Sequence, residues 1–296
     1  MQWLQTKQQV QLLGLFAHPH DCTHALGTMG NHIQNGDKVT VAILTDGGRT
    51  HNERLFEELR KDETERDTSV TEQQRQEYTD QKYDEAKRAC ALFGVDDVRC
   101  MGYPDKPLRS SDEMVDEVAD LICEVRPDLL ITEVPEKQTR SRLSSGHDDH
   151  TMTAAVVNDA LVVASHPRQG QKRVPHKPAR IYYCAPSQPG DEVDVYVDIS
   201  GWEEQRIEAE MSYKSQGHTP AYARQRIMRL YGHYGWCAGV NLAEKFLRGN
   251  ANVTSLLPVT DLDLKASKGS GIDRAMSVMG DDYKEDVEQT IRAKSS

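Results

Sequence analysis

The strongest constraint on the fold of this chain is a repeated alternation between short apolar runs and helical patterns. Four runs in the first half have the composition and length of buried strands: residues 10–17, 38–45, 98–101 and 128–132. Helical spacing of apolar residues is found between and after these runs, over residues 22–34, 83–93, 111–125 and 148–164. Strands that alternate with helices in this way form a mostly parallel sheet. We therefore predict an α/β fold with helices on both faces of the sheet.

The remaining segments predict additions to that core. Residues 46–80 are rich in Arg, Glu, Asp, Gln and Thr with few apolar anchors, which indicates a long loop or an exposed helix that could form a lid. We expect further strands at 181–185 and 193–199, and a helical C-terminal elaboration at 202–215, 221–231 and 242–247. Residues 260–296 give no clear core signal. We therefore predict one domain over residues 1–250 and a C-terminal extension over residues 251–296.

Composition limits the partners that the chain can bind. It has 36 Lys and Arg against 47 Asp and Glu, a net charge of −11, which disfavours nucleic acid and anionic membrane surfaces and favours a neutral or cationic small molecule. The first residues lack a secretory pattern and no run approaches a membrane span, so we expect a cytoplasmic protein. Its six cysteines form no CxxC pair and are expected to be reduced. A homo-oligomer is compatible with this composition.

Two clusters of histidine and aspartate follow predicted strands. The segment AHPHD occupies residues 17–21, and GHDDH occupies residues 146–150, before a predicted helix. Ligands bind beyond the carboxyl ends of parallel strands, so the two segments should face one crevice. A catalytic zinc ion takes three nitrogen or oxygen ligands and keeps a position open, which two histidines and an aspartate would satisfy. One cluster alone would more often be caps and surface residues, but two favour a metal site.

These two segments belong to a longer series of motifs. In chain order the series is AHPHD at 17–21, LTDG at 44–47, GYPD at 102–105, HDDH at 147–150, DIS at 198–200, SQ at 215–216 and AEKF at 243–246. The series resembles the LmbE-like, or PIG-L-type, deacetylase superfamily over about residues 10–248. The two histidine motifs are the most specific parts of this resemblance.

The resemblance implies a Rossmann-like fold and hydrolysis of an N-acetyl group from an amino sugar or sugar conjugate. It implies that His18, Asp21 and His150 bind the metal, usually zinc, and that His147 steadies the tetrahedral oxyanion. Asp149 could orient a neighbouring imidazole through a hydrogen bond, or it could be a solvated carboxylate at a helix start. Two histidines and one aspartate could also bind iron, manganese or cobalt.

The chain departs from the superfamily at one informative position. The common motif is AHPDD, in which the first aspartate is the general base, and His20 stands at that place. A neutral imidazole can accept a proton near neutral pH, so we predict that His20 is the base. A fourth metal ligand, a substrate contact and a relic of lost activity are the alternatives. Cys22 replaces a common glutamate, and we expect it to pack in the core rather than to bind metal.

Three further residues are candidates for binding substrate. By the resemblance Asp105 could bind sugar hydroxyls, although it could also be a simple turn residue. Arg140 and Arg142 could contact the substrate or belong to a solvated loop. Two rival functions are a metallohydrolase of another bond, such as a phosphoester, and a catalytically silent sugar-binding protein. The absence of Lys and Arg from both core motifs weighs against the first rival, and the missing AHPDD aspartate supports the second.

Overall fold

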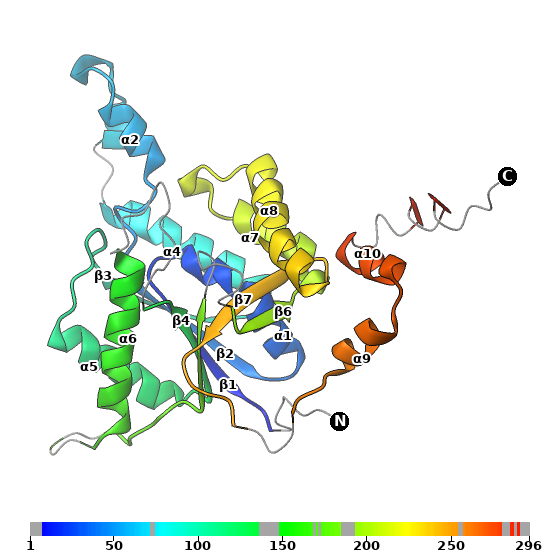
Figure 1. The fold of residues 1–296 in the computed structure, drawn as a ribbon. Coiled ribbons are helices and arrows are strands. Elements are labelled where there is room, and N and C mark those ends of the chain that lie inside the picture. Colours follow the sequence, from blue (N-terminus) through cyan, green and yellow to red (C-terminus); the bar gives the residue numbers. More distant parts are fainter. Residues whose placement is uncertain are drawn as a thin grey trace.

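Among the residues that the computed structural model describes, a seven-stranded sheet with helices on both faces forms the centre of the molecule (Figure 1). These residues are 8–71, 75–135, 148–167, 170, 173–184, 193–253, 257–279, 285–286 and 289–290. The strands are β1 (Gln11–Phe16), β2 (Lys38–Thr45), β3 (Asp97–Tyr103), β4 (Leu129–Glu133), β5 (Arg180–Cys184), β6 (Val195–Asp198) and β7 (Ala243–Arg248).

The helices connect and cover these strands. The α-helices are α1 (Leu26–Gln34), α2 (Glu53–Leu59), α3 (Thr68–Thr71), α4 (Arg75–Ala91), α5 (Asp112–Val125), α6 (Asp149–Ser165), α7 (Glu203–Met211), α8 (Pro220–Ala238), α9 (Asp261–Lys268) and α10 (Gly271–Met279). Short 3-10 turns are η1 (Asp21–His24), η2 (Glu63–Glu65), η4 (Ser200–Trp202) and η5 (Lys214–Gln216). From β1 to α6 the element order is the strand and helix alternation that the sequence predicts.

The strand order explains where a ligand can bind. The sheet runs β3-β2-β1-β4-β5-β7-β6, and the pairs from β3 through β5 are parallel, whereas β7 is antiparallel to both β5 and β6. The chain moves outward from β1 to β2 and β3 and then returns to place β4 on the other side of β1. Ligands bind at such a reversal, beyond the carboxyl ends of the two strands.

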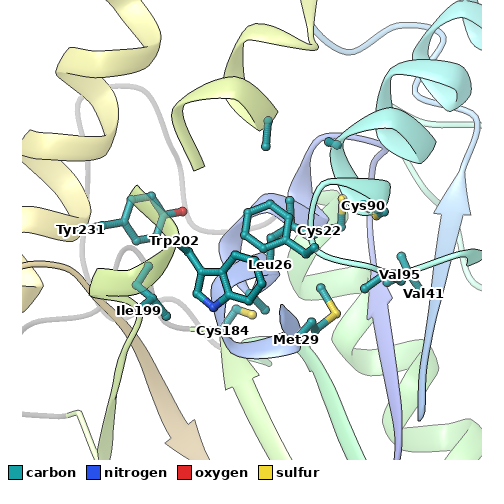
Figure 2. Close-up of a cluster of buried hydrophobic side chains, with 14 of the residues drawn as sticks. Cys22, Leu26, Met29, Val41, Cys90, Val95, Cys184, Ile199, Trp202 and Tyr231 are labelled. Carbon is teal, nitrogen blue, oxygen red and sulfur yellow. Dashed lines mark hydrogen bonds between the residues drawn. The ribbon is translucent and has the colours of Figure 1, made fainter. Parts of the chain in front are cut away.

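Both faces of the sheet are buried, which explains the unbroken apolar runs in the central strands. In β1, Leu12 and Phe16 pack into one core cluster with α1, α4, α7 and α8, whereas Leu13 and Leu15 pack into a second cluster with α5 and α6. Figure 2 shows part of the first cluster, with Trp202, Leu26 and Met29 among its labelled members. Each fully buried leucine or phenylalanine contributes about 1.5–3 kcal/mol to stability.

Two sequence predictions need correction or refinement. The prediction of a helix at 242–247 is wrong, because these residues form β7 between β5 and β6, where the strand ladder outweighs the helix propensity of Ala, Glu, Lys and Leu. In the polar segment 46–80, α2 has no buried residue and projects away from the sheet (Figure 1), as predicted, but Val70 of α3 and Tyr78 of α4 are buried.

The C-terminal helices lie at the edge of the molecule. Neither α9 nor α10 contains a buried residue. Within the described part of the chain, no helix has the length and apolar character needed to cross a membrane.

Candidate metal and catalytic site

The two histidine segments meet at the reversal of strand order. AHPHD follows β1 directly and turns through a hydrogen bond from the Asp21 N–H to the His18 carbonyl, 3.0 Å long. The neighbouring strand β4 ends at Glu133, and α6 begins at Asp149 at the same end of the sheet. The fold therefore brings residues more than a hundred positions apart to the same end of the sheet.

The three residues predicted as metal ligands lie together. One nitrogen each of His18 and His150 and one oxygen of Asp21 are all within 4.8 Å of one another. Asp21 Oδ2 lies 2.8 Å from His18 Nδ1 and 3.7 Å from His150 Nδ1. His18 and Asp21 are buried, whereas about a quarter of the His150 side chain is exposed. One side of the group is therefore open.

The donor set fits a divalent cation. Each ring nitrogen of His18 faces a carboxylate oxygen. Nδ1 lies 2.8 Å from Asp21 Oδ2, and Nε2 lies 3.0 Å from Asp149 Oδ2. A neutral imidazole carries only one N–H, so one of these contacts needs either a second proton or a cation. Two imidazole nitrogens and a carboxylate match the ligands that zinc and related metals prefer.

Asp149 orients His18 rather than facing solvent. It is buried, and besides His18 it accepts hydrogen bonds from the backbone N–H groups of Lys106 (2.9 Å) and Leu108 (2.8 Å). Burial alone would raise the pKa of Asp149, but these hydrogen bonds outweigh burial and hold the pKa below its ordinary value. The carboxylate therefore fixes the imidazole so that Nδ1 points toward Asp21, an arrangement typical of metal-binding histidines.

Glu133 is a member of the site that sequence reasoning missed. Its Oε2 lies 3.3 Å from His150 Nδ1, and Glu133 is buried. Burial lowers the pKa of His150, but Asp21 and Glu133 outweigh burial and raise it to about 10. The position of Glu133, directly after the predicted strand 128–132, was an available signal. Three buried carboxylates around two imidazoles make the site strongly attractive to cations.

His20 belongs to a second group of polar residues beside the ligands. Its Nε2 lies 3.1 Å from Glu210 Oε2, and the Glu210 carboxylate also lies 3.3 Å from His218 Nδ1 and 3.3 Å from Arg226 Nε. Burial lowers the pKa of His20 below its ordinary value although Glu210 opposes this effect, so the imidazole is neutral near pH 7. No local sequence signal pointed to Glu210, because it lies 190 positions from His20.

A cavity of about 520 Å³ joins the two groups. Asp21 and His150 line it from the ligand group, and His20, His218 and Arg226 line it from the second group. His51 and Glu53, at the start of the polar segment, also contribute to the wall. Its volume lies in the range of small-molecule sites, roughly 300–1,000 Å³.

Asp105 lies close to the ligands but is not among the residues that line this cavity. It has no exposed surface, and its carboxylate accepts hydrogen bonds from the Arg49 N–H (2.9 Å) and the Thr50 hydroxyl (2.6 Å). The carboxylate therefore ties the loop after β2 to the end of β3. A direct contact with substrate would require Asp105 to release these donors.

Cys22 packs away from the ligands, as expected. It is fully buried, with its sulfur 3.5 Å from the Tyr213 hydroxyl and 3.8 Å from the sulfur of Cys90. Figure 2 shows Cys22 and Cys90 side by side in the core. Three other predicted site residues, His147, Arg140 and Arg142, lie outside the described residues.

Comparisons with known proteins place this site in context. A family model described as PIG-L, GlcNAc-PI de-N-acetylase, matches residues 13–161, about half of the chain. The structure is similar to that of GalB, a 4-carboxy-2-hydroxymuconate hydratase from Pseudomonas putida, with a TM-score of 0.66 and 19% identity over 83% of this chain and 99% of that one. It is also similar to the conserved protein TT1542 from Thermus thermophilus, with a TM-score of 0.64 and 20% identity over 83% of this chain and 97% of that one.

A third similar structure is an N,N'-diacetylchitobiose deacetylase from Pyrococcus horikoshii. The TM-score is 0.62 at 20% identity, and the match covers 82% of this chain and 84% of that one. At these identities the three structures establish a shared fold. Their printed activities differ, so the fold alone does not select a reaction.

Proposed function

This chain belongs to the PIG-L, GlcNAc-PI de-N-acetylase, family, and from that membership we propose that it is a cytoplasmic, metal-dependent hydrolase that removes the N-acetyl group of an amino sugar or sugar conjugate. The observation that carries the proposal is the donor set of His18, Asp21 and His150 at the open end of the sheet, with Asp149 behind His18. A hydrolase of this kind needs such a set beside a cavity of substrate size.

We assign the metal to His18, Asp21 and His150, with zinc as the first choice. When bound, such an ion lowers the pKa of water and polarises a carbonyl oxygen as a Lewis acid. Asp149 would keep the His18 lone pair directed at the ion. Glu133 lies beside the same His150 nitrogen that faces Asp21, so it would add negative charge next to the ion. About a quarter of the His150 side chain is exposed to the cavity, which leaves room there for the acetamido group of the substrate.

We assign the proton transfer to His20. Its Nε2 is hydrogen-bonded to Glu210, so Nδ1 is the ring nitrogen that can accept the proton of the attacking water. The water oxygen adds to the acetyl carbon, the C–N bond breaks, and the proton passes to the leaving amine. The products are acetate and a free amino group.

Three residues have proposed roles that rest on sequence position. We propose that His147 donates a hydrogen bond to the oxygen that becomes negative in the transition state. Arg140 and Arg142 are proposed as substrate contacts. The cavity favours a sugar-sized group, because its wall combines imidazoles, carboxylates and the guanidinium of Arg226.

Acetate release tests this proposal. The metal-loaded protein is incubated with a panel of N-acetylated amino sugars and conjugates, with a phosphomonoester panel and 4-carboxy-2-hydroxymuconate as competing reactions. We expect acetate from at least one sugar, and His150→Ala should abolish it. Phosphate release or hydration without acetate would overturn the proposal, and so would tight metal binding without hydrolysis of any amide.

A further inference from the structure

We propose that Glu210 is a positioning residue that fixes the imidazole of His20 in the one tautomer able to accept the proton. This role rests on the proposed deacetylation. The evidence is the contact between His20 Nε2 and Glu210 Oε2, 3.1 Å long, between two side chains that are both buried. An ionised carboxylate can only accept, so Nε2 carries the hydrogen and Nδ1 keeps its lone pair. The direction of the imidazole therefore depends on α7.

The carboxylate of Glu210 is itself firmly held. Its Oε1 accepts a hydrogen bond from Arg226 Nε, in α8, at 3.3 Å, and its Oε2 lies 3.3 Å from His218 Nδ1. Tyr213 packs edge-on against the His20 ring at 4.7 Å between centroids. Burial raises the pKa of Glu210, but His20, His218 and Arg226 outweigh burial and hold the pKa well below its ordinary value. The carboxylate is ionised at neutral pH.

His20, Glu210 and His218 could also be read as a second metal site, since their ligand atoms lie within 4.8 Å of one another. The geometry of His218 argues against this reading. Its Nδ1 is the nitrogen that lies 3.3 Å from Glu210 Oε2, and it also lies 3.0 Å from the backbone carbonyl of Glu210, which only accepts hydrogen bonds. This nitrogen therefore carries the hydrogen and offers no lone pair to a metal beside the carboxylate. The guanidinium of Arg226 already neutralises the carboxylate.

The chemistry of the base explains why a histidine needs such a residue. A carboxylate base has two equivalent oxygens and needs no choice of tautomer. An imidazole has two inequivalent nitrogens, and the hydrogen bond at one decides which form the other takes. The exchange of the AHPDD aspartate for His20 therefore works only with an acceptor behind the ring, and Glu210 supplies it.

The substitution Glu210→Gln tests the tautomer directly. Arg226 requires an acceptor, so the amide oxygen should turn toward Arg226 and the amide N–H₂ toward His20 Nε2. That orientation makes Nε2 the acceptor and puts the hydrogen on Nδ1. The corresponding change beside the catalytic histidine of a serine protease lowers kcat by about 10⁴-fold. We expect at least a hundredfold loss in kcat with KM within about twofold.

A double-mutant cycle separates positioning from a structural role. In the His20→Asp background there is no imidazole to orient, so adding Glu210→Gln should change kcat less than about threefold. Glu85→Gln is the matched control, because Glu85 is also a buried carboxylate but accepts hydrogen bonds from the N–H and hydroxyl of Ser215 instead of from a histidine. It should leave kcat within about twofold. Equal losses from Glu210→Gln in both backgrounds would overturn the inference.

A spectroscopic readout does not depend on activity. Long-range proton–nitrogen spectra of the ¹⁵N-histidine-labelled, zinc-loaded protein identify each tautomer, and His20→Asn assigns the His20 signals. We expect the Nε2–H form in the wild type and the Nδ1–H form in Glu210→Gln. An unchanged tautomer would overturn the inference. If the wild type releases no acetate but the tautomer changes, the proposed reaction fails while the positioning by Glu210 stands.

Discussion

Replacing Asp149 by asparagine should weaken metal binding and stability together. The carboxylate accepts three hydrogen bonds, from His18 Nε2 and from the N–H groups of Lys106 and Leu108. An asparagine has one oxygen and one N–H₂ group in the same space. In either orientation of the amide, one backbone N–H therefore faces another donor.

The size of each effect follows from these contacts. One buried N–H left without an acceptor costs about 1–3 kcal/mol of unfolding free energy. Loss of a carboxylate behind a metal-binding histidine lowers metal affinity by about 10–100-fold, or roughly 1.4–2.7 kcal/mol. If the N–H₂ group faces His18, the imidazole changes tautomer and the loss should lie at the upper end.

Two measurements on Asp149→Asn check this prediction. Competition with a fluorescent chelator gives the zinc affinity at pH 7, and urea unfolding of the metal-free protein gives the stability. Asp148→Asn is the control, because Asp148 caps α6 through the Thr151 N–H and asparagine caps equally well. Its zinc affinity should stay within about threefold. If Asp149→Asn lost stability but kept wild-type zinc affinity, the argument that Asp149 orients a ligand would be refuted.

Three further predictions concern the base, a buried lysine and a close helix contact. His20→Ala should lower kcat by about 10²–10⁴-fold with unchanged metal content, measured by acetate release and elemental analysis, whereas loss of metal would make His20 a ligand. Burial lowers the pKa of Lys82 to about 8, so between pH 8 and 10.5 the unfolded chain holds a proton that the folded protein lacks. Urea unfolding should therefore show the stability of the wild type rising across this pH window relative to that of Lys82→Met. Stability profiles of the two proteins that run parallel with pH would contradict this prediction. Gly235→Ala should cost about 1–3 kcal/mol because the added carbon would overlap the backbone oxygen of Asn241, while Gly232→Ala in the same helix makes only an ordinary contact with Leu242 and should not lower the melting temperature.

The central strands and the ligand motifs could be predicted because their signals are local. In β1 every residue from Leu12 to Phe16 is apolar or glycine, since both faces are buried, and the strand ends where the polar AHPHD segment begins. β7 could not be predicted in the same way. Its residues favour a helix by themselves, and only pairing with β5 and β6 makes them a strand.

The same limit applies to the site. His18 and Asp21 are neighbours in sequence, and a second histidine motif after another strand was enough to suggest a shared crevice. Glu210 gives no such signal, because its contact with His20 depends on how α7 packs over the turn after β1. Asp105 was expected either to bind sugar hydroxyls or to be a turn residue, and the sequence could not reveal that Arg49 and Thr50 donate hydrogen bonds to its carboxylate.

The most direct test of the account is a metal titration of acetate release. The protein is stripped with a chelator, zinc is restored in steps, and acetate release from the best N-acetylated sugar of the panel is measured beside bound zinc. The account predicts that activity rises in proportion to zinc, saturates at one ion per chain, and is absent at every loading in Asp21→Asn. Full activity in the stripped protein, or zinc bound at one per chain without any release of acetate, would contradict it.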